Sequence, residues 1–256
     1  MLQLPTIDPG DEISVSASAY VLHCKCPQQA LARFAGVFAA DSLSAFRGSL
    51  AHAIFAKHLL DGPIPEQTFE STCKQAIGGS NLNFKIQNLN LKPSHIKGVI
   101  KEVGGLYDRF KKMPVDGFES AEEFLKVQLG GGLTILGRVD AVYRDGDKLR
   151  LVDWKTGNIG EVETQLKFYA ALWALEHDEL PAEIEAFSVQ TGEHETFTPT
   201  ANLLNELLED LVKMVTEVRG AWISGDDLER RAGPWCQYCP LLEECVEGQA
   251  SQRILG

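Results

Sequence analysis

Two β-rich runs separated by a short polar turn constrain the fold of this chain more than any other feature. The runs are residues 133–143 and 149–155, and Arg144-Asp145-Gly146-Asp147 between them is a turn signal. We therefore predict a hairpin in which Asp140 of the first strand lies beside Asp153 of the second. Two carboxylates on neighbouring strands can share one ligand, so the hairpin is the first place to look for chemistry.

The lysine after Asp153 adds to this prediction. Side chains alternate along a strand, so Asp153 and Lys155 should point to the same face. Carboxylate oxygens suit Mg²⁺ and Mn²⁺, and a metal on Asp140 and Asp153 could polarise a phosphate and activate a water. Lys155 could orient that water, deprotonate it or stabilise the transition state, and the sequence leaves these roles open. An isolated D-x-K tripeptide also occurs as ordinary surface charge, so other motifs must support this interpretation.

Two helical motifs flank the hairpin along the chain. Upstream, G-x-x-x-H runs from Gly48 to His52, and downstream, Q-x-x-x-Y runs from Gln165 to Tyr169. Positions i and i+4 share a helix face, so Gln165 and Tyr169 can reach the same group. Each motif alone has an ordinary alternative, a partly buried histidine in one case and the polar edge of an amphipathic helix in the other. Their order around the D…D-x-K core makes coincidence a poor explanation.

With these motifs the chain resembles the PD-(D/E)XK nuclease superfamily, and within it the RecB-like branch of AddB-type nuclease domains and CRISPR-associated RecB-like exonucleases. The resemblance implies an α/β fold, a restriction-endonuclease-like mixed sheet flanked by helices, with a helical insertion. It also implies hydrolysis of DNA with Mg²⁺ or Mn²⁺ on His52, Asp140 and Asp153. Glu123, just before the first expected strand, is an additional acidic candidate. The catalytic residues implied are Lys155, Asp153, Asp140, Gln165 and Tyr169.

The six cysteines need a separate explanation. A disulfide framework fits poorly, because the N-terminus lacks the basic start and apolar run of a secretory signal. A structural Zn²⁺ fits better, since C-x-x-C suits tetrahedral thiolate coordination. The resemblance implies a [4Fe-4S] cluster instead, because iron-sulfur members of the branch use one N-terminal and three C-terminal cysteines. Its ligands, joining the two ends of the chain, would be Cys26, Cys236, Cys239 and Cys245.

The N-terminal cluster ligand has two candidates, Cys24 and Cys26. Pro27 directly after Cys26, with Ser18 eight residues before it, fits the pattern of the branch and favours Cys26. Cys24 and Cys73 are then packing residues or free thiols. A cluster between the two chain ends closes a long loop, so we expect its role to be structural, with redox sensing left open.

The pattern along the chain predicts a single nuclease domain. We expect a flexible N-terminus over 1–13, N-terminal helices over 14–60, a helical insertion over 61–118, a catalytic core over 119–200 and a C-terminal helix with the cluster cysteines over 201–256. Within the insertion, the glycines at 78–79 and the polar residues that follow suggest a mobile connection through 90. Helices are expected over 27–39, 45–60, 163–177 and 203–223, and strands over 124–129, 183–190 and 194–197.

The charge balance bears on how nucleic acid would bind. A net charge of −12, from 24 Lys and Arg against 36 Asp and Glu, argues against a generally basic binding surface. A local basic wall is expected within 85–112, where lysines and arginines outnumber acidic residues, and an ordinary solvated helix face is the alternative. The DNA-binding candidates are Lys97, Lys101, Arg109, Lys111 and Lys112.

Two features that the sequence lacks limit the expected location and activity of the protein. No run approaches the ~20 apolar residues needed to span a bilayer, and no G-x-x-x-x-G-K-[ST] loop is present, so we expect a cytoplasmic protein without a helicase motor. The resemblance implies an exonuclease on single-stranded DNA or DNA ends, in DNA repair, recombination or CRISPR adaptation. Expected partners are a helicase, recombination or CRISPR integrase complex, or further copies of the chain. The alternative is a DNA-end-binding scaffold subunit with little activity alone.

Overall fold

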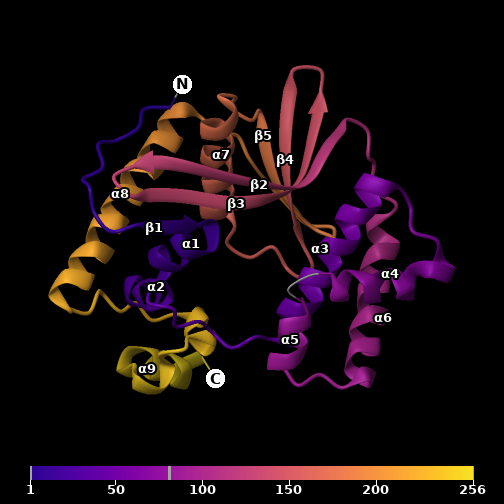
Figure 1. The fold of residues 1–256 in the computed structure, drawn as a ribbon, viewed down its shortest axis with the longest axis horizontal. Coiled ribbons are helices and arrows are strands. Elements are labelled where there is room, and N and C mark those ends of the chain that lie inside the picture. Colours follow the sequence, from indigo (N-terminus) through magenta and orange to yellow (C-terminus); the bar gives the residue numbers. More distant parts are fainter. Residues whose placement is uncertain (1, 80–81, 256) are drawn as a thin grey trace.

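The computed structural model describes residues 2–79 and 82–255, which form one six-stranded mixed sheet with helices on both faces (Figure 1). The predicted mixed sheet flanked by helices is confirmed. Its strands are β1 (Ile13–Ser16), β2 (Phe118–Gly130), β3 (Leu133–Asp145), β4 (Lys148–Lys155), β5 (Glu183–Ser188) and β6 (His194–Phe197). The helices are α1 (Ala17–Lys25), α2 (Pro27–Phe34), α3 (Leu43–Asp61), α4 (Glu66–Gly78), α5 (Leu82–Asn88), α6 (Pro93–Phe110), α7 (Glu163–His177), α8 (Ala201–Ser224) and α9 (Val246–Leu255), with 3-10 turns η1 (Pro234–Tyr238) and η2 (Leu242–Glu244).

The predicted hairpin is formed by β3 and β4. These strands pair antiparallel, with Ala141 opposite Val152 and Asp145 opposite Lys148. The connection turns at Gly146, whose φ of 58° is readily adopted only by glycine. The register brings Asp140 next to Asp153, as the sequence predicts.

Strand β3 is the centre of the sheet because it has partners on both edges. One edge pairs with β2 along most of its length. The other edge pairs in parallel with β1 up to Leu136 and antiparallel with β4 from Ala141 onward. In the described pairing, Gly137 to Asp140 therefore have no strand on that edge. Backbone and side chains at this split are free to serve a site.

The N-terminal segment contacts the rest of the fold through a strand pairing and one arginine. Ile13, expected in a flexible N-terminus, begins β1 and lies opposite Leu133. Before it, the Arg219 guanidinium of α8 donates hydrogen bonds to the carbonyls of Asp8 and Asp11, and it also bonds the carbonyl of Gly131. A single long-range arginine thus ties this segment to α8 and to the β2–β3 turn.

The sheet separates two hydrophobic cores, and β4 shows how alternation builds them. Leu149 and Leu151 pack with α7 and α8 on one face. Val152 and Trp154 pack with α3 and α6 on the other. Because Asp153 follows the face of Leu151, its carboxylate is aimed toward α7, where the polar residues of that helix lie.

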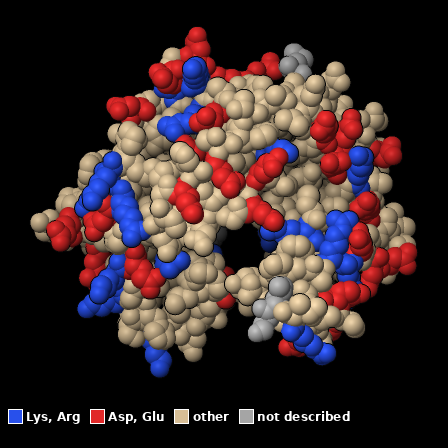
Figure 2. Space-filling view, turned by 180° about the vertical axis from the view of Figure 1, so that it is seen from behind, with Lys and Arg blue, Asp and Glu red and all other residues tan. Residues whose placement is uncertain are grey.

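Apart from α7 and α8, the helices form two separate masses beside the sheet. Helices α3 to α6 lie on one side, and α1, α2 and the C-terminal segment lie on the other (Figure 1). Residues 35–42 run between these masses, and the Asn88 amide of α5 donates to Asp41 at 2.8 Å. The space-filling view shows an opening near the centre of the molecule (Figure 2). No helix among the described residues is long and apolar enough to cross a membrane.

Candidate active site

His52 and Asp140 lie together where the strands of the sheet separate. His52 Nδ1 of α3 is 3.1 Å from Asp140 Oδ1. The other oxygen of Asp140 accepts a hydrogen bond of 2.7 Å from the Trp154 backbone N–H, across the split beside β4. Gly48 lets α3 approach this point, since a Cβ there would lie 3.3 Å from Thr156 Oγ1. The aspartate is therefore fixed at one oxygen and faces the histidine with the other.

Glu122 completes a three-residue group that the sequence did not predict. Ligand atoms of His52, Glu122 and Asp140 all lie within 4.8 Å of one another, the only such group of three among the described residues. The backbone of Glu122 has a φ of 56° within β2, and the pairing of Ala121 with Ala141 and of Glu123 with Val139 places Glu122 across from Asp140. Its neighbour Glu123, the candidate from sequence, instead contacts His177 at 3.1 Å. The acidic residue that β2 supplies to this group is therefore Glu122, one residue before the predicted Glu123.

Lys155 and Gln165 surround the second predicted carboxylate. Lys155 Nζ lies 2.6 Å from Asp153 Oδ2 and donates to Gln165 Oε1 at 2.8 Å. The amide nitrogen of Gln165 in turn donates to Asp153 Oδ1 at 3.1 Å and lies 3.5 Å from the Tyr169 hydroxyl. The structure thus brings together Asp153, Lys155, Gln165 and Tyr169 in one connected network. Within the Q-x-x-x-Y motif, Gln165 reaches the Asp153 carboxylate directly, and Tyr169 contacts Gln165.

The electrostatics of the site favour a bound cation. Burial alone would lower the pKa of His52, but Asp140, Asp153 and Glu122 outweigh it and raise the pKa to about 9. Burial raises the pKa of Asp153 to about 6, although Lys155 acts in the opposite direction. Burial and the Asp140 charge also raise the pKa of Glu122. The raised pKa values mean that burial and crowding make the charged carboxylates less favourable. A bound divalent cation would offset this cost.

Oxygen and imidazole donors at this spacing fit a hard divalent cation such as Mg²⁺ or Mn²⁺. They border a cavity of about 730 Å³, together with Lys85 and Arg138. Lys85 donates to Ser49 Oγ at 3.0 Å, and Arg138 lies 3.6 Å from Glu122. These two cations are the lysine and the arginine of the cavity lining. Lys85 falls within the basic region expected over 85–112, whereas Arg138 was not among the DNA-binding candidates taken from the sequence.

The predicted DNA-binding residues do not line this cavity. Lys97, Lys101 and Lys111 line a separate cavity between α4 and α6, where Lys111 pairs with Asp108 at 2.6 Å. Arg109 donates to the carbonyl of Gln190, at another cavity. Lys112 lines none of the described cavities that contain catalytic residues. Their role in DNA binding stays a prediction.

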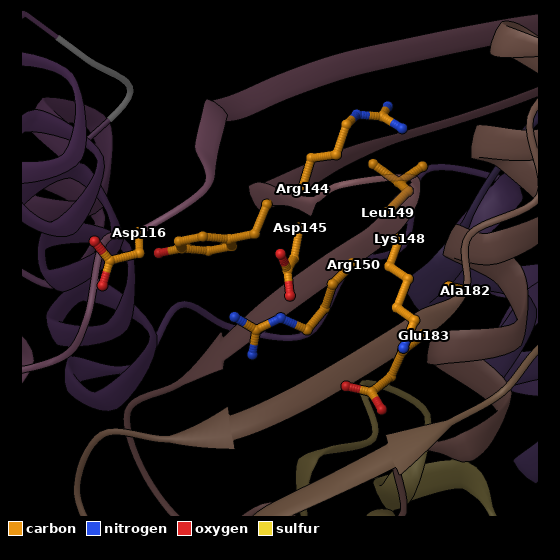
Figure 3. A pocket seen from close by; sticks show the side chains of 9 residues that line it. Asp116, Arg144, Asp145, Lys148, Leu149, Arg150, Ala182 and Glu183 are labelled. Carbon is orange, nitrogen blue, oxygen red and sulfur yellow. The ribbon is translucent and has the colours of Figure 1, made fainter.

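The far end of the β3–β4 hairpin carries another charged cavity, of about 470 Å³ (Figure 3). Two of its lining cations, Arg144 and Arg150, are engaged in ion pairs within the fold. Arg144 donates to both oxygens of Glu179 at 2.7 and 3.0 Å, and Arg150 donates to Glu185 at 2.7 Å. This cavity shares no lining residue with the catalytic one.

The four predicted cluster cysteines come from the two ends of the chain and converge. Burial raises the pKa of the Cys239 thiol, and the nearby Cys26, Cys236 and Cys245 raise it further. Backbone N–H groups of Gly233 and Gly248 donate to the sulfurs of Cys236 at 3.4 Å and Cys245 at 3.3 Å. By contrast, Cys24 is exposed, and Cys73 is buried in the core between α3, α4 and α6.

Comparison with known proteins gives one family and a similar fold. A sequence model of the family described as the PD-(D/E)XK nuclease superfamily matches residues 14–246. A solved structure of an exonuclease candidate from Eubacterium rectale is 14% identical, with a TM-score of 0.50 over 90% of this chain and 86% of that one. The structure of SSO0001 is 16% identical, with a TM-score of 0.40 over 93% of this chain and 87% of that one. No curated protein matches the chain.

Proposed function

The chain belongs to the PD-(D/E)XK nuclease superfamily, and we propose that it is a Mg²⁺- or Mn²⁺-dependent deoxyribonuclease that acts as an exonuclease on single strands or DNA ends. The observation that carries this proposal is the grouping of His52, Glu122 and Asp140 beside the Asp153–Lys155 pair. The metal would be held by these three residues, with Asp153 as a further ligand. It would polarise the scissile phosphate and lower the pKa of a bound water.

The remaining side chains act on the water and the phosphate. Lys155 is held by Asp153 and Gln165, so its ammonium group is positioned beside the nucleophile and stabilises negative charge on the phosphate. Gln165 fixes the side chains of Lys155 and Asp153 relative to each other through one hydrogen bond to each. Lys85 and Arg138 attract the phosphates on the open side of the cavity.

Cleavage of end-labelled DNA tests this proposal. Wild type should degrade single-stranded DNA with Mg²⁺ or Mn²⁺ and not with EDTA, and its product ladder should show removal from one end. Lys155→Ala should reduce the rate about 10²- to 10⁴-fold. Lys148→Ala is the matched control, because Lys148 lies at the other end of the same strand and outside the catalytic cavity. DNA binding without cleavage by wild type would instead support the scaffold alternative.

We further propose that Cys26, Cys236, Cys239 and Cys245 hold a [4Fe-4S] cluster. Their convergence from both chain ends supports a shared metal centre. Four thiolates can hold either a tetrahedral Zn²⁺ or a [4Fe-4S] cluster, and the resemblance of the cysteine pattern to iron-sulfur members of the RecB-like branch favours the cluster. Iron and sulfide analysis of anaerobically purified protein tests it, with Cys73→Ser as the control that retains the iron and a stoichiometric zinc content as the contrary result.

A further inference from the structure

A second cavity lies against the catalytic network and is built from aromatic and basic residues. It has a volume of about 370 Å³ and lies between α1, α2, the 35–42 connection and the cysteine segment. We call it the stacking groove and define it by its principal lining residues, Lys25, Gln29, Arg33, Phe38, Trp235 and Tyr238. Its lining residues include no aspartate or glutamate, although the chain has 36. The groove is therefore a local exception to the acidic character of the protein.

The aromatic rings of the groove are available to a ligand. Phe38 is 62% exposed and Tyr238 is 70% exposed. A cation lies over each of two rings, with Arg33 at 5.5 Å from Phe38 and Lys25 at 5.7 Å from Trp235. Exposed rings of this size are costly in water, and rings beside cations are the combination that binds bases and phosphates of an unpaired strand.

A buried polar atom in the groove has no partner in the fold. Gln29 is only 6% exposed, and its side-chain oxygen accepts no hydrogen bond from the described residues. An unpaired buried amide oxygen is unfavourable unless a ligand or water donates to it. Because this oxygen is itself inaccessible, an internal water is the donor that suits it, and the rings and cations of the groove are the groups that a ligand can contact.

The groove leads directly to the catalytic side chains. Gln165 lines the groove, while Tyr169, one helical turn further along α7, lines the catalytic cavity. Gln165 also contacts Asp153 and Lys155. A strand whose scissile phosphate lies at the metal site would therefore place its neighbouring nucleotides in the stacking groove.

We propose that the stacking groove binds the unpaired nucleotides next to the scissile phosphate, and that it makes the enzyme selective for single strands. Bases stack on Phe38, Trp235 and Tyr238, and Lys25 and Arg33 contact the phosphates. A duplex cannot use the groove, because its base faces are already stacked and its base edges are paired. The inference rests on the proposed nuclease function and adds the residues that select single strands over duplex DNA.

Binding without cleavage tests the groove separately from catalysis. Fluorescence anisotropy with labelled oligothymidine and with a duplex of equal length is measured in EDTA, in a Lys155→Ala background. Phe38→Ala and Tyr238→Ala should each weaken single-strand binding about fivefold to 150-fold and leave duplex binding unchanged. Leu60→Ala is the matched control, since Leu60 is 60% exposed but lies at the end of α3 outside the groove. Tyr238→Phe should retain wild-type binding, because it keeps the ring.

The charged residues have their own readout. Arg33→Gln should lower the slope of log affinity against log salt by about 0.7, the value for one phosphate contact to a single strand. Unchanged single-strand affinity in Phe38→Ala and Tyr238→Ala, with the fold intact by thermal unfolding, would overturn the inference. That result leaves the nuclease proposal standing if wild type still cleaves DNA. Conversely, wild type that binds through the groove but cleaves nothing with Mg²⁺ or Mn²⁺ would overturn only the nuclease proposal.

Discussion

Replacing Glu122 by glutamine should have opposite effects on function and on stability. The carboxylate of Glu122 lies with Asp140 and His52 in a group whose ligand atoms are within 4.8 Å of one another. Glutamine keeps the shape of the side chain but removes its charge. The variant should therefore bind the metal poorly, while the metal-free fold should lose a source of repulsion.

The magnitudes follow from the geometry. Changes in outer-shell partners of a metal ligand cost about 10- to 100-fold in metal affinity, so loss of a direct ligand should cost at least about 100-fold. Two carboxylates no more than 4.8 Å apart repel by at least about 3.5 kcal/mol at an effective dielectric constant of about 20. Attraction of Glu122 to His52 and to Arg138, 3.6 Å away, offsets most of this. The net stabilisation of Glu122→Gln should be about 1 kcal/mol, or about 2–4 °C in Tm.

Two assays measure these effects, and Glu123→Gln is the matched control one residue away. The Mn²⁺ concentration for half-maximal cleavage should rise in Glu122→Gln and stay at the wild-type value in Glu123→Gln. Thermal unfolding in EDTA should give a higher Tm for Glu122→Gln than for wild type. A Glu122→Gln variant with normal metal dependence, or a Glu123→Gln variant that loses it, would refute the assignment of Glu122 to the metal site.

Three further changes test other parts of the structure. Gln165→Ala removes the bridge between Asp153 and Lys155, so kcat should fall about 10- to 100-fold with little change in the secondary structure seen by circular dichroism. Phe110→Ala removes a ring that is 2% exposed and stacks on Phe55 at 4.1 Å, so urea unfolding should show a loss of about 3–5 kcal/mol. Burial lowers the pKa of His58, which means that the folded state favours the neutral ring; stability should decrease as the pH falls below about 6.5, and His58→Gln should reduce that decrease in pH-dependent urea unfolding.

The hairpin and its charged residues could be predicted from sequence because they depend on local rules. Strand alternation gives Asp153 and Lys155 a common face, and the turn at Gly146 sets the pairing that brings Asp140 alongside. Helix α7 (Glu163–His177) and strand β6 (His194–Phe197) begin and end where the pattern predicts. Local periodicity was sufficient for these two elements, whereas the helix expected over 27–39 ends at Phe34 and the strand expected over 124–129 begins at Phe118.

Glu122 could not be predicted in this way. Its left-handed backbone conformation lies inside a long strand, and no glycine or turn residue marks the position. The choice of Glu122 over Glu123 depends on the β2–β3 register, which places Glu122 across from Asp140 and which the local pattern does not give. The only sequence signal was the pair of adjacent glutamates opposite the G-R-V-D segment.

Strand β1 and the basic residues illustrate a different difficulty, namely long-range placement. The four residues Ile13–Ser16 are too short to stand out, and they become a strand through parallel pairing with β3. The lysines of α6 looked like a basic wall, but Lys97 and Lys101 line a cavity that the catalytic residues do not reach. Lys85 does lie at the catalytic cavity, which only the packing of α5 against α3 reveals.

The most direct test of the central claim is the position of the metal itself. Crystals soaked in Mn²⁺ should give an anomalous difference peak within about 2.5 Å of ligand atoms from His52, Glu122 and Asp140. The peak should be absent from crystals of Glu122→Gln grown and soaked in the same way. A strong peak elsewhere, with none at these residues in protein that cleaves DNA with Mn²⁺, would contradict the account of the active site.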